Sequence, residues 1–310
     1  MKHLFRILVV DQYNLKLRNE IICLIKEVIP LCQKNERILR HNKTILIQCV
    51  KNNFMEGIKL ILDSRMVDVN VMTEENETAF TYASLFKNFD ALQLLYPFID
   101  DINQGIGHKT AIYESFTIFS NNNIPIQLNN NIIEFLVEHG GNIDHGLFGA
   151  AQWNNMYWFK YFLNKGANIN FLTPDVYSHS ILHKIYFAHK IWCVKTINIE
   201  MFELAISEGA NINHVDLFGK TVLSMAINKV FRYDKKSVYT DIIDIIYGAM
   251  YNNHIIIDIS DIPEFVLHLF TFQTPIIYRF TNVAYLMLYA YITYCNELPR
   301  IQHIQIPKLV

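Results

Sequence analysis

The chain has little glycine, proline and cysteine for its length, and these shortages exclude several classes of protein. Eleven glycines and eight prolines in 310 residues do not gather into a flexible linker, which favours one continuous array over two globular domains. The five cysteines are odd in number and show no CxxC spacing. We therefore expect buried thiols in a reducing compartment, the cytoplasm, and no disulfide framework. The cysteines are Cys23, Cys32, Cys49, Cys193 and Cys295.

Charge of either sign is also scarce overall, but it is unevenly distributed. The net charge is −2, so the chain has no electrostatic footprint for nucleic acid. Residues 1–65 hold 12 basic and 6 acidic residues, whereas residues 66–150 hold 2 and 11. Solvated helix faces that happen to segregate explain this pattern. The alternative is an acidic surface over residues 66–150 that selects a basic partner.

No pattern of catalytic chemistry is found. The segment Gly105-Ile106-Gly107 lacks the third glycine of a phosphate-binding loop, and no G-x-S-x-G is present. His179 and His183 lie four residues apart, as paired zinc ligands do on a helix, but no third ligand of known spacing completes the set. We expect neither an enzyme nor a cofactor or metal.

A short phrase that recurs along the chain is its most informative feature. Gly166-Ala167-Asn168-Ile169-Asn170 returns as Gly209-Ala210-Asn211-Ile212-Asn213, each time after an amphipathic run. A helix can end on a left-handed glycine, and asparagine tolerates the turn that follows. An internal repeat of this kind predicts a stacked architecture. Degraded copies are Asp68-Val69-Asn70, Asp101-Ile102-Asn103 and Gly140-Gly141-Asn142-Ile143-Asp144.

The pattern resembles the ankyrin repeat, in which a T-P-L-H box opens a first helix, and a second helix ends before G-A-D-V-N and a hairpin tip. The best matches to the first part are Gly219–Ala226 and Ser178–His183. The resemblance implies an all-α solenoid of helix-turn-helix units with short β-hairpin tips. It also implies that His183 is the structural histidine of its box, bonded to neighbouring backbone.

The repeats are irregular in length. The distance from Asn70 to Asn103 is 33 residues, which is the ankyrin period, but Asp144 to Asn170 is only 26 and Asn170 to Asn213 is 43. We expect a short hairpin in the 26-residue repeat and extra residues between the two helices of the long ones. We predict three segments: an N-terminal helical cap (1–41), about six repeats (42–258) and a C-terminal helical cap (259–310).

The two ends carry the remaining alternatives. Residues 1–10 begin like a secretory signal, but the apolar run ends at Asp11, so we expect none. Residues 280–296 contain no charged side chain, and the length of this run is at the lower limit for a membrane span. Four tyrosines there favour a buried cap, and we expect no membrane contact. Ile262-Pro263-Glu264-Phe265 is a poor match to an F-box-like start, which leaves a ubiquitin-ligase adaptor as the alternative function.

The resemblance implies that a protein partner binds to the hairpin tips and the concave face of the first helices. We expect a non-catalytic interaction protein, monomeric alone, of a kind found in large DNA viruses or intracellular bacteria, where the partner would be a host protein. Apolar tips in two neighbouring repeats would form one patch. The candidate binding residues are Glu74, Glu75, Phe171, Leu172, Asp175, Asp216, Leu217 and Phe218. Asn70, Asn170 and Asn213 occupy the position that asparaginyl hydroxylases modify in some ankyrin proteins.

Overall fold

A computed structural model describes residues 19, 22–23, 25–27, 44–65, 67–74, 76–105, 109–117, 126–172, 177–188, 197–226, 241–242 and 245–246. The chain divides into two compact bodies, which are described separately. The N-terminal body comprises residues 1–168 and 173–175, and the C-terminal body comprises residues 169–172 and 176–310. The predicted caps at 1–41 and 259–310 lie almost wholly outside the described residues, although Ile25 is buried.

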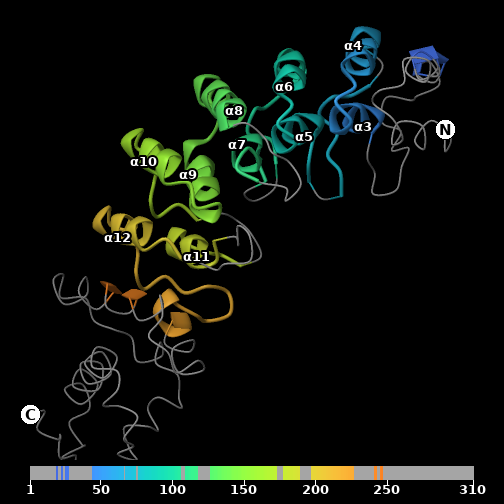
Figure 1. Cartoon of the computed structure of the whole chain (residues 1–310). Coiled ribbons are helices and arrows are strands. Elements are labelled where there is room, and N and C mark those ends of the chain that lie inside the picture. The colour runs from blue at the N-terminus through green and yellow to red at the C-terminus, as the bar shows by residue number, and fades with distance from the viewer. Residues whose placement is uncertain are drawn as a thin grey trace, which may run out of the picture. The chain divides into compact units, whose positions relative to one another are not determined.

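Within the described residues the fold is a series of helix pairs. In the N-terminal body the first helices α3, α5, α7 and α9 pack side by side, while the second helices form another row (Figure 1). The four pairs are α3 (Ile45–Lys51) with α4 (Met55–Ser64), α5 (Ala79–Leu85) with α6 (Phe89–Leu95), α7 (Ala111–Glu114) with α8 (Ile126–Glu138), and α9 (Ile143–Gln152) with α10 (Met156–Asn164). A 3₁₀ turn, η3 (Tyr96–Phe98), follows α6. The C-terminal body adds α11 (Ile181–Tyr186) with α12 (Ile199–Ser207), and residues 222–226 are helical.

Three of the first helices begin at a threonine that caps them. Thr44 and Thr78 occupy N-cap positions, and their Oγ1 atoms accept hydrogen bonds from the backbone N–H three residues later. Thr221 makes the same bond to the N–H of Ser224 at 3.1 Å. Such caps satisfy N–H groups that have no partner inside the helix. The threonine of these three boxes therefore fixes where its helix begins, whereas Asn142 caps α9.

The second helices end as the recurring phrase predicts. Gly140, Gly166 and Gly209 all adopt left-handed φ values, between 85° and 91°. The residue after each glycine donates its N–H to a carbonyl five residues earlier, as in Ala210 to Ala205 at 3.0 Å. This is the Schellman closure of a helix C-terminus. A side chain at φ near +90° would be strained, so glycine sets the point at which the chain leaves α8, α10 and α12.

Side-chain amides then link each repeat to the next. The Asn103 amide donates to the Gly140 carbonyl at 3.0 Å, and its Oδ1 accepts from the N–H of Asn142 at 2.6 Å. Asn70 bridges Phe98 and Asp100 in the same two-bond pattern. In the C-terminal body, Asn170 bridges Gly209 and Asn211 at 2.9 and 2.7 Å. We call this set the asparagine ladder.

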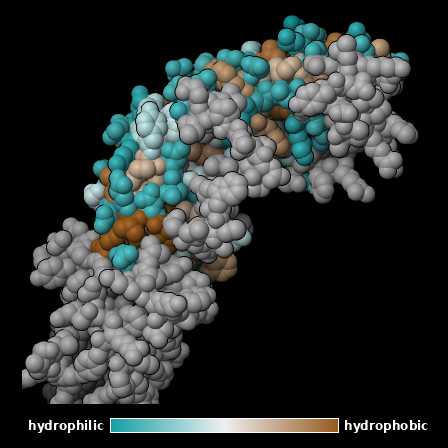
Figure 2. Space-filling model, viewed as in Figure 1, coloured by the Kyte–Doolittle hydropathy of each residue, from teal (hydrophilic) through white to brown (hydrophobic). Residues whose placement is uncertain are grey.

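The core lies between the helices, and the first helices are almost entirely inside it. Every residue of α5, α7 and α11 is buried. The expectation that the first helices present a solvent-facing concave surface is therefore wrong for these three. The helices α5 and α7 pack on both neighbouring first helices and on their own second helix, and α11 packs on α12. By contrast, Figure 2 shows mainly hydrophilic surface along α6, α8 and α10.

The tips and the cysteines differ in part from expectation. The described residues contain no β-strand, and the tips are closed by turns. The 26-residue repeat has the short connection expected, since Asn142 caps α9 directly after Gly141. Burial raises the pKa of the Cys49 thiol to about 12, so Cys49 is an inert buried thiol as predicted. Cys23, however, is exposed, and the other three cysteines lie outside the described residues.

Candidate functional site

Two hairpin tips share one five-residue turn. In residues 73–77 the N–H of Thr73 donates to the carbonyl of Glu77 at 2.9 Å, and in 216–220 the N–H of Asp216 donates to the carbonyl of Lys220 at 3.0 Å. The fourth residue is left-handed in both, with φ 63° at Asn76 and 69° at Gly219. Asparagine and glycine are the residues that adopt this conformation most readily. The same backbone thus presents different side chains on two tips.

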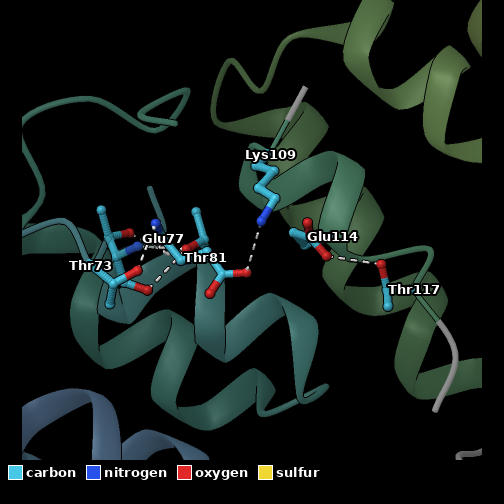
Figure 3. Close-up of polar contacts among 7 residues, drawn as sticks. Thr73, Glu77, Thr81, Lys109, Glu114 and Thr117 are labelled. Carbon is cyan, nitrogen blue, oxygen red and sulfur yellow. Dashed lines mark hydrogen bonds and ion pairs between the residues drawn. The ribbon is translucent and has the colours of Figure 1, made fainter. Parts of the chain in front are cut away.

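The tip at residues 73–77 is polar. Thr73 Oγ1 accepts from the N–H of Glu77 at 3.2 Å, and the Glu77 carboxylate pairs with Lys109 at 3.8 Å (Figure 3). Glu74 is exposed at the turn. Glu75, the other acidic residue predicted for this tip, lies outside the described residues. This tip therefore offers an acidic side chain and no apolar one.

Asp216 organises the second tip from within. Its side chain is buried, and Oδ1 accepts hydrogen bonds from the N–H of Phe218 at 2.8 Å and of Lys220 at 2.9 Å. A carboxylate that accepts two backbone N–H groups is fully engaged in holding the turn. We therefore assign Asp216 a positioning role in place of the partner contact predicted from the sequence. The turn that it closes holds Leu217 and Phe218 outward.

Leu217 and Phe218, which are 67% and 65% exposed, begin a row of neighbouring side chains in the C-terminal body. Tyr177 and Phe187 in this row are also exposed, whereas His179 is half-buried. The Phe218 ring lies 6.0 Å from Tyr177, and the N–H of Leu217 donates to the Tyr177 carbonyl at 3.2 Å. Tyr177 stacks on His179 at 5.3 Å, and His179 lies 5.1 Å from Phe187. We call Tyr177, His179, Phe187, Leu217 and Phe218 the tip surface.

The base of the tip surface is one buried histidine. His183 Nδ1 lies 2.8 Å from Ser180 Oγ, and Nε2 lies 3.1 Å from the Lys220 carbonyl. Because a carbonyl only accepts, Nε2 carries the proton and Nδ1 accepts from the serine hydroxyl. The structural role implied for His183 by the ankyrin resemblance is thus confirmed, since its ring bonds backbone from the next repeat.

The environment of His183 favours its neutral form. Burial lowers its pKa from 6.5 to about 4, and the neighbouring His179 and His214 act in the same direction. The hydrogen bond to Lys220 and the carboxylate of Asp216 oppose this shift but are outweighed. The ring is fully buried, so desolvation of a charged imidazolium is the dominant effect. At neutral pH His183 is therefore uncharged, and its hydrogen bonds join α11 to the tip.

The sequence predicted only part of this surface. Leu217 and Phe218 are exposed as expected, and Leu172 is 43% exposed. Phe171 is half-buried, and Asp175 lies outside the described residues. The sequence did not single out Tyr177, His179 and Phe187 as surface residues, because they lie just outside the helix of their box. The signal that could have identified them is their position, since Tyr177 and His179 closely precede the N-cap Ser180 and Phe187 directly follows α11.

The predicted modification sites are rungs of the asparagine ladder. Both amide atoms of Asn70 and of Asn170 are bonded to the next repeat. Asn213 stands at the matching position, and its buried Oδ1 has no hydrogen-bond partner among the described residues. Hydroxylation of these three asparagines stays a prediction. A hydroxylase acting on Asn70 or Asn170 would first have to break these hydrogen bonds.

The other sequence hypotheses receive no site here. Within the described residues, no group of three His, Cys, Asp or Glu side chains is arranged to hold a metal. In the same part of the chain, no helix combines the length and hydrophobicity needed to cross a bilayer. Residues 261–298, on which the adaptor and membrane alternatives depend, lie outside it.

The matches of this chain to known proteins are all among solved structures. No protein-family model and no curated protein matches the sequence. Among solved structures, the human ASB11 ankyrin repeat domain is 18% identical, with 73% of this chain and 91% of that one covered at a TM-score of 0.48. The Bcl-3 ankyrin repeat domain is 16% identical, covering 79% and 97%, at 0.46. An ankyrin repeat domain from Acinetobacter baumannii is 20% identical, covering 66% and 96%, at 0.44.

The class of protein is defined by the repeated geometry itself. First helices capped by threonine, second helices ended by a left-handed glycine and asparagines that bond the next repeat recur at matching positions in several repeats. These features, together with closed tips in two repeats, define the ankyrin-repeat fold.

Proposed function

We propose that this chain is a non-catalytic recognition module that binds a protein partner through the tip surface of its C-terminal body. The observation that carries the proposal is the exposure of Leu217 and Phe218 on a tip whose backbone is held by Asp216. Large apolar side chains fixed in an exposed position lose little conformational entropy on binding. Exposed aromatic clusters of this kind are typical centres of protein interfaces.

The composition of the tip surface favours a protein over other ligands. Four of its five members are exposed aromatic or aliphatic side chains, and the fifth is an imidazole, His179. Stacking on nucleic-acid bases would need interleaved basic residues. Cys49 is a free buried thiol, which agrees with a reducing compartment such as the cytoplasm. A host protein is the partner that we propose if the chain is viral or bacterial.

Recovery of bound proteins from the natural cell tests this proposal. The test variant is Tyr177→Ala with Phe218→Ala, because these two rings contact each other. The matched control is Tyr157→Ala, an aromatic residue of α10 that is 66% exposed and belongs to the N-terminal body. We expect a specific partner to bind at least about tenfold more weakly to the double variant than to the control.

Two outcomes would contradict the proposal. Equal recovery of every specific partner by wild type, double variant and control would exclude the tip surface. Loss of the partner from Tyr157→Ala alone would place the interface on α10. Far-ultraviolet circular dichroism of all three proteins must agree before the comparison is made, because an unfolded variant also loses its partner. Recovery of a ligase subunit with all three would instead favour the adaptor alternative.

A further inference from the structure

We infer that the tip surface is pH-sensitive: acidification releases the 214–220 tip because it protonates the buried His183, which packs between His179 and His214 and bonds the tip at Lys220. The inference deepens the proposed recognition function, since it describes how binding at that surface would be regulated. It stands on the arrangement of His179, His183 and His214 around the base of the tip.

The three imidazoles form one packed group from two separate segments. His179 stacks on His183 with ring centroids 5.4 Å apart and an interplanar angle of 11°. His214 meets His183 edge-on at 5.7 Å, and its Nε2 lies 2.6 Å from the Ser178 carbonyl. His179 and His183 precede and open α11, whereas His214 begins the tip. The cluster therefore joins the tip to the segment that carries Tyr177.

The histidine cluster is hydrogen-bonded to the tip at Lys220. Its carbonyl accepts from His183 Nε2 at 3.1 Å and also from the N–H of Asp216 at 3.0 Å. Its own N–H donates to Asp216 Oδ1 at 2.9 Å. Loss of the hydrogen bond from His183 would therefore weaken the hold on Lys220, which is the residue that closes the turn around Leu217 and Phe218.

Protonation of His183 disturbs this arrangement in two ways. A proton on Nδ1 would face Ser180 Oγ, which now donates to that nitrogen and would have to turn its own hydrogen away and accept instead. The new charge would also lie within a buried group beside His179 and His214, which both disfavour it. Among the described residues, Asp216 is the opposing charge that faces the ring, and its Oδ1 already accepts two N–H groups.

The direction of the effect follows from linkage. The folded-state pKa of His183 lies below its ordinary value, so the open tip binds the proton more readily than the closed tip. The closed tip is therefore fully favoured above pH 6.5 and becomes less favoured as pH falls from 6.5 towards about 4. One such proton raises the opening equilibrium by about tenfold for each pH unit within this window.

The molecule contains its own control for this effect. The 73–77 tip has the same turn but no histidine, and the position that matches His183 in the first helix before that tip is Ile47, which cannot take up a proton. In α5 the same helix position is Thr81, whose Oγ1 accepts from the N–H of Thr78 at 2.7 Å. Amide hydrogen exchange, read residue by residue by NMR without any partner, can therefore compare matched positions. These are Lys220 and Glu77, whose N–H groups close the two turns.

We expect the protection factor of Lys220 to fall by about tenfold per pH unit below 6.5 while that of Glu77 stays constant. Equal behaviour of the two amides would overturn the inference. In His183→Thr, which copies Thr81 and keeps Asp216, the pH response of Lys220 should disappear. Its survival in that variant would show that His183 does not cause the response and would also overturn the inference.

The wild-type comparison decides the question even if His183→Thr does not fold. Because no partner is present, a negative result leaves protein recognition by the tip surface untouched. Conversely, a negative recovery experiment with Tyr177→Ala and Phe218→Ala would not alter the exchange result.

Discussion

At the scale of single residues, the most unusual environment outside the tip surface is that of Lys87. It sits in the turn between α5 and α6 with a left-handed φ of 59°. Its buried ammonium donates to the Glu114 carbonyl at 3.0 Å and to the Ser115 carbonyl, both at the C-terminal end of α7. Burial lowers the pKa of Lys87 to about 7, although the Glu114 carboxylate opposes the shift. That carboxylate also accepts from Thr117 Oγ1 at 2.8 Å (Figure 3).

Replacement of Lys87 by methionine should destabilise the protein by about 1–3 kcal/mol near neutral pH, because two buried carbonyls lose their donor. The control is Lys59→Met on α4, where the side chain is exposed and a change within ~0.5 kcal/mol is expected. Urea unfolding of the two variants measures both values. An equal, small effect in both would show that the carbonyls find other partners.

The same lysine makes a prediction about pH. Its folded-state pKa lies below the ordinary value of 10.5, so unfolding takes up a proton between about 7 and 10.5. Wild-type stability should therefore rise relative to Lys87→Met as pH increases through this window. Unfolding at pH 7 and about two units higher should show a growing difference. A constant difference would mean that Lys87 keeps its proton in the folded state.

At the scale of the repeat, one rung of the asparagine ladder is incomplete. Asp144 stands where Asn70, Asn103 and Asn170 stand in other repeats, and its Oδ1 accepts from the N–H of Asn168 at 2.7 Å. A carboxylate cannot donate, so the second bond of the rung, to the carbonyl two residues earlier, cannot form. By analogy with Asn103 and Gly140, that carbonyl belongs to Gly166.

Asp144→Asn should therefore stabilise the N-terminal body by about 0.5–1.5 kcal/mol, and Asn103→Asp should destabilise it by a similar amount. Asp101→Asn is the matched control. The Asp101 side chain accepts from the N–H of Asn103 at 2.8 Å and an asparagine can do the same. Thermal unfolding monitored by circular dichroism ranks the three variants. A destabilised Asp144→Asn would show that the carboxylate has a role other than that of a rung.

At the scale of the whole chain, two surfaces compete as the binding site. Residues 66–150 carry 11 acidic and 2 basic residues, and Glu74, Asp90 and Glu134 are among those exposed. The tip surface carries almost no charge. The two bodies therefore differ in the kind of partner that each could attract.

The dependence of the partner's affinity on ionic strength distinguishes the two surfaces. If the partner binds to the tip surface, its affinity should change less than about threefold between physiological ionic strength and 1 M, where the Debye length falls from ~8 to ~3 Å. Calorimetric titration at both conditions measures this. A loss of more than about tenfold would place the interface on the acidic surface, where attraction to a basic partner is screened.

Agreement between sequence and structure depended on the range of the interactions. Gly166 and Gly209 end helices because of their own backbone freedom, so the repeat predicted them directly. The burial of every residue in α5 and α11 could not be read in the same way. A side chain in a first helix faces two neighbouring repeats, and the sequence of one repeat does not show how closely those neighbours approach.

The sequence by itself determined the ankyrin-repeat architecture, the glycine ends of the second helices at Gly166 and Gly209, and the exposure of Leu217 and Phe218. Each of these is set by local backbone geometry or by a short turn. Only the tertiary structure decided that Asp216 is a buried turn-former, that Tyr177 and Phe187 extend the tip surface, and that His183 is held uncharged. The contact of Tyr177 with Phe218 and the bond from His183 to Lys220 each join positions more than 30 residues apart. Packing between successive repeats, rather than any local preference, creates those contacts.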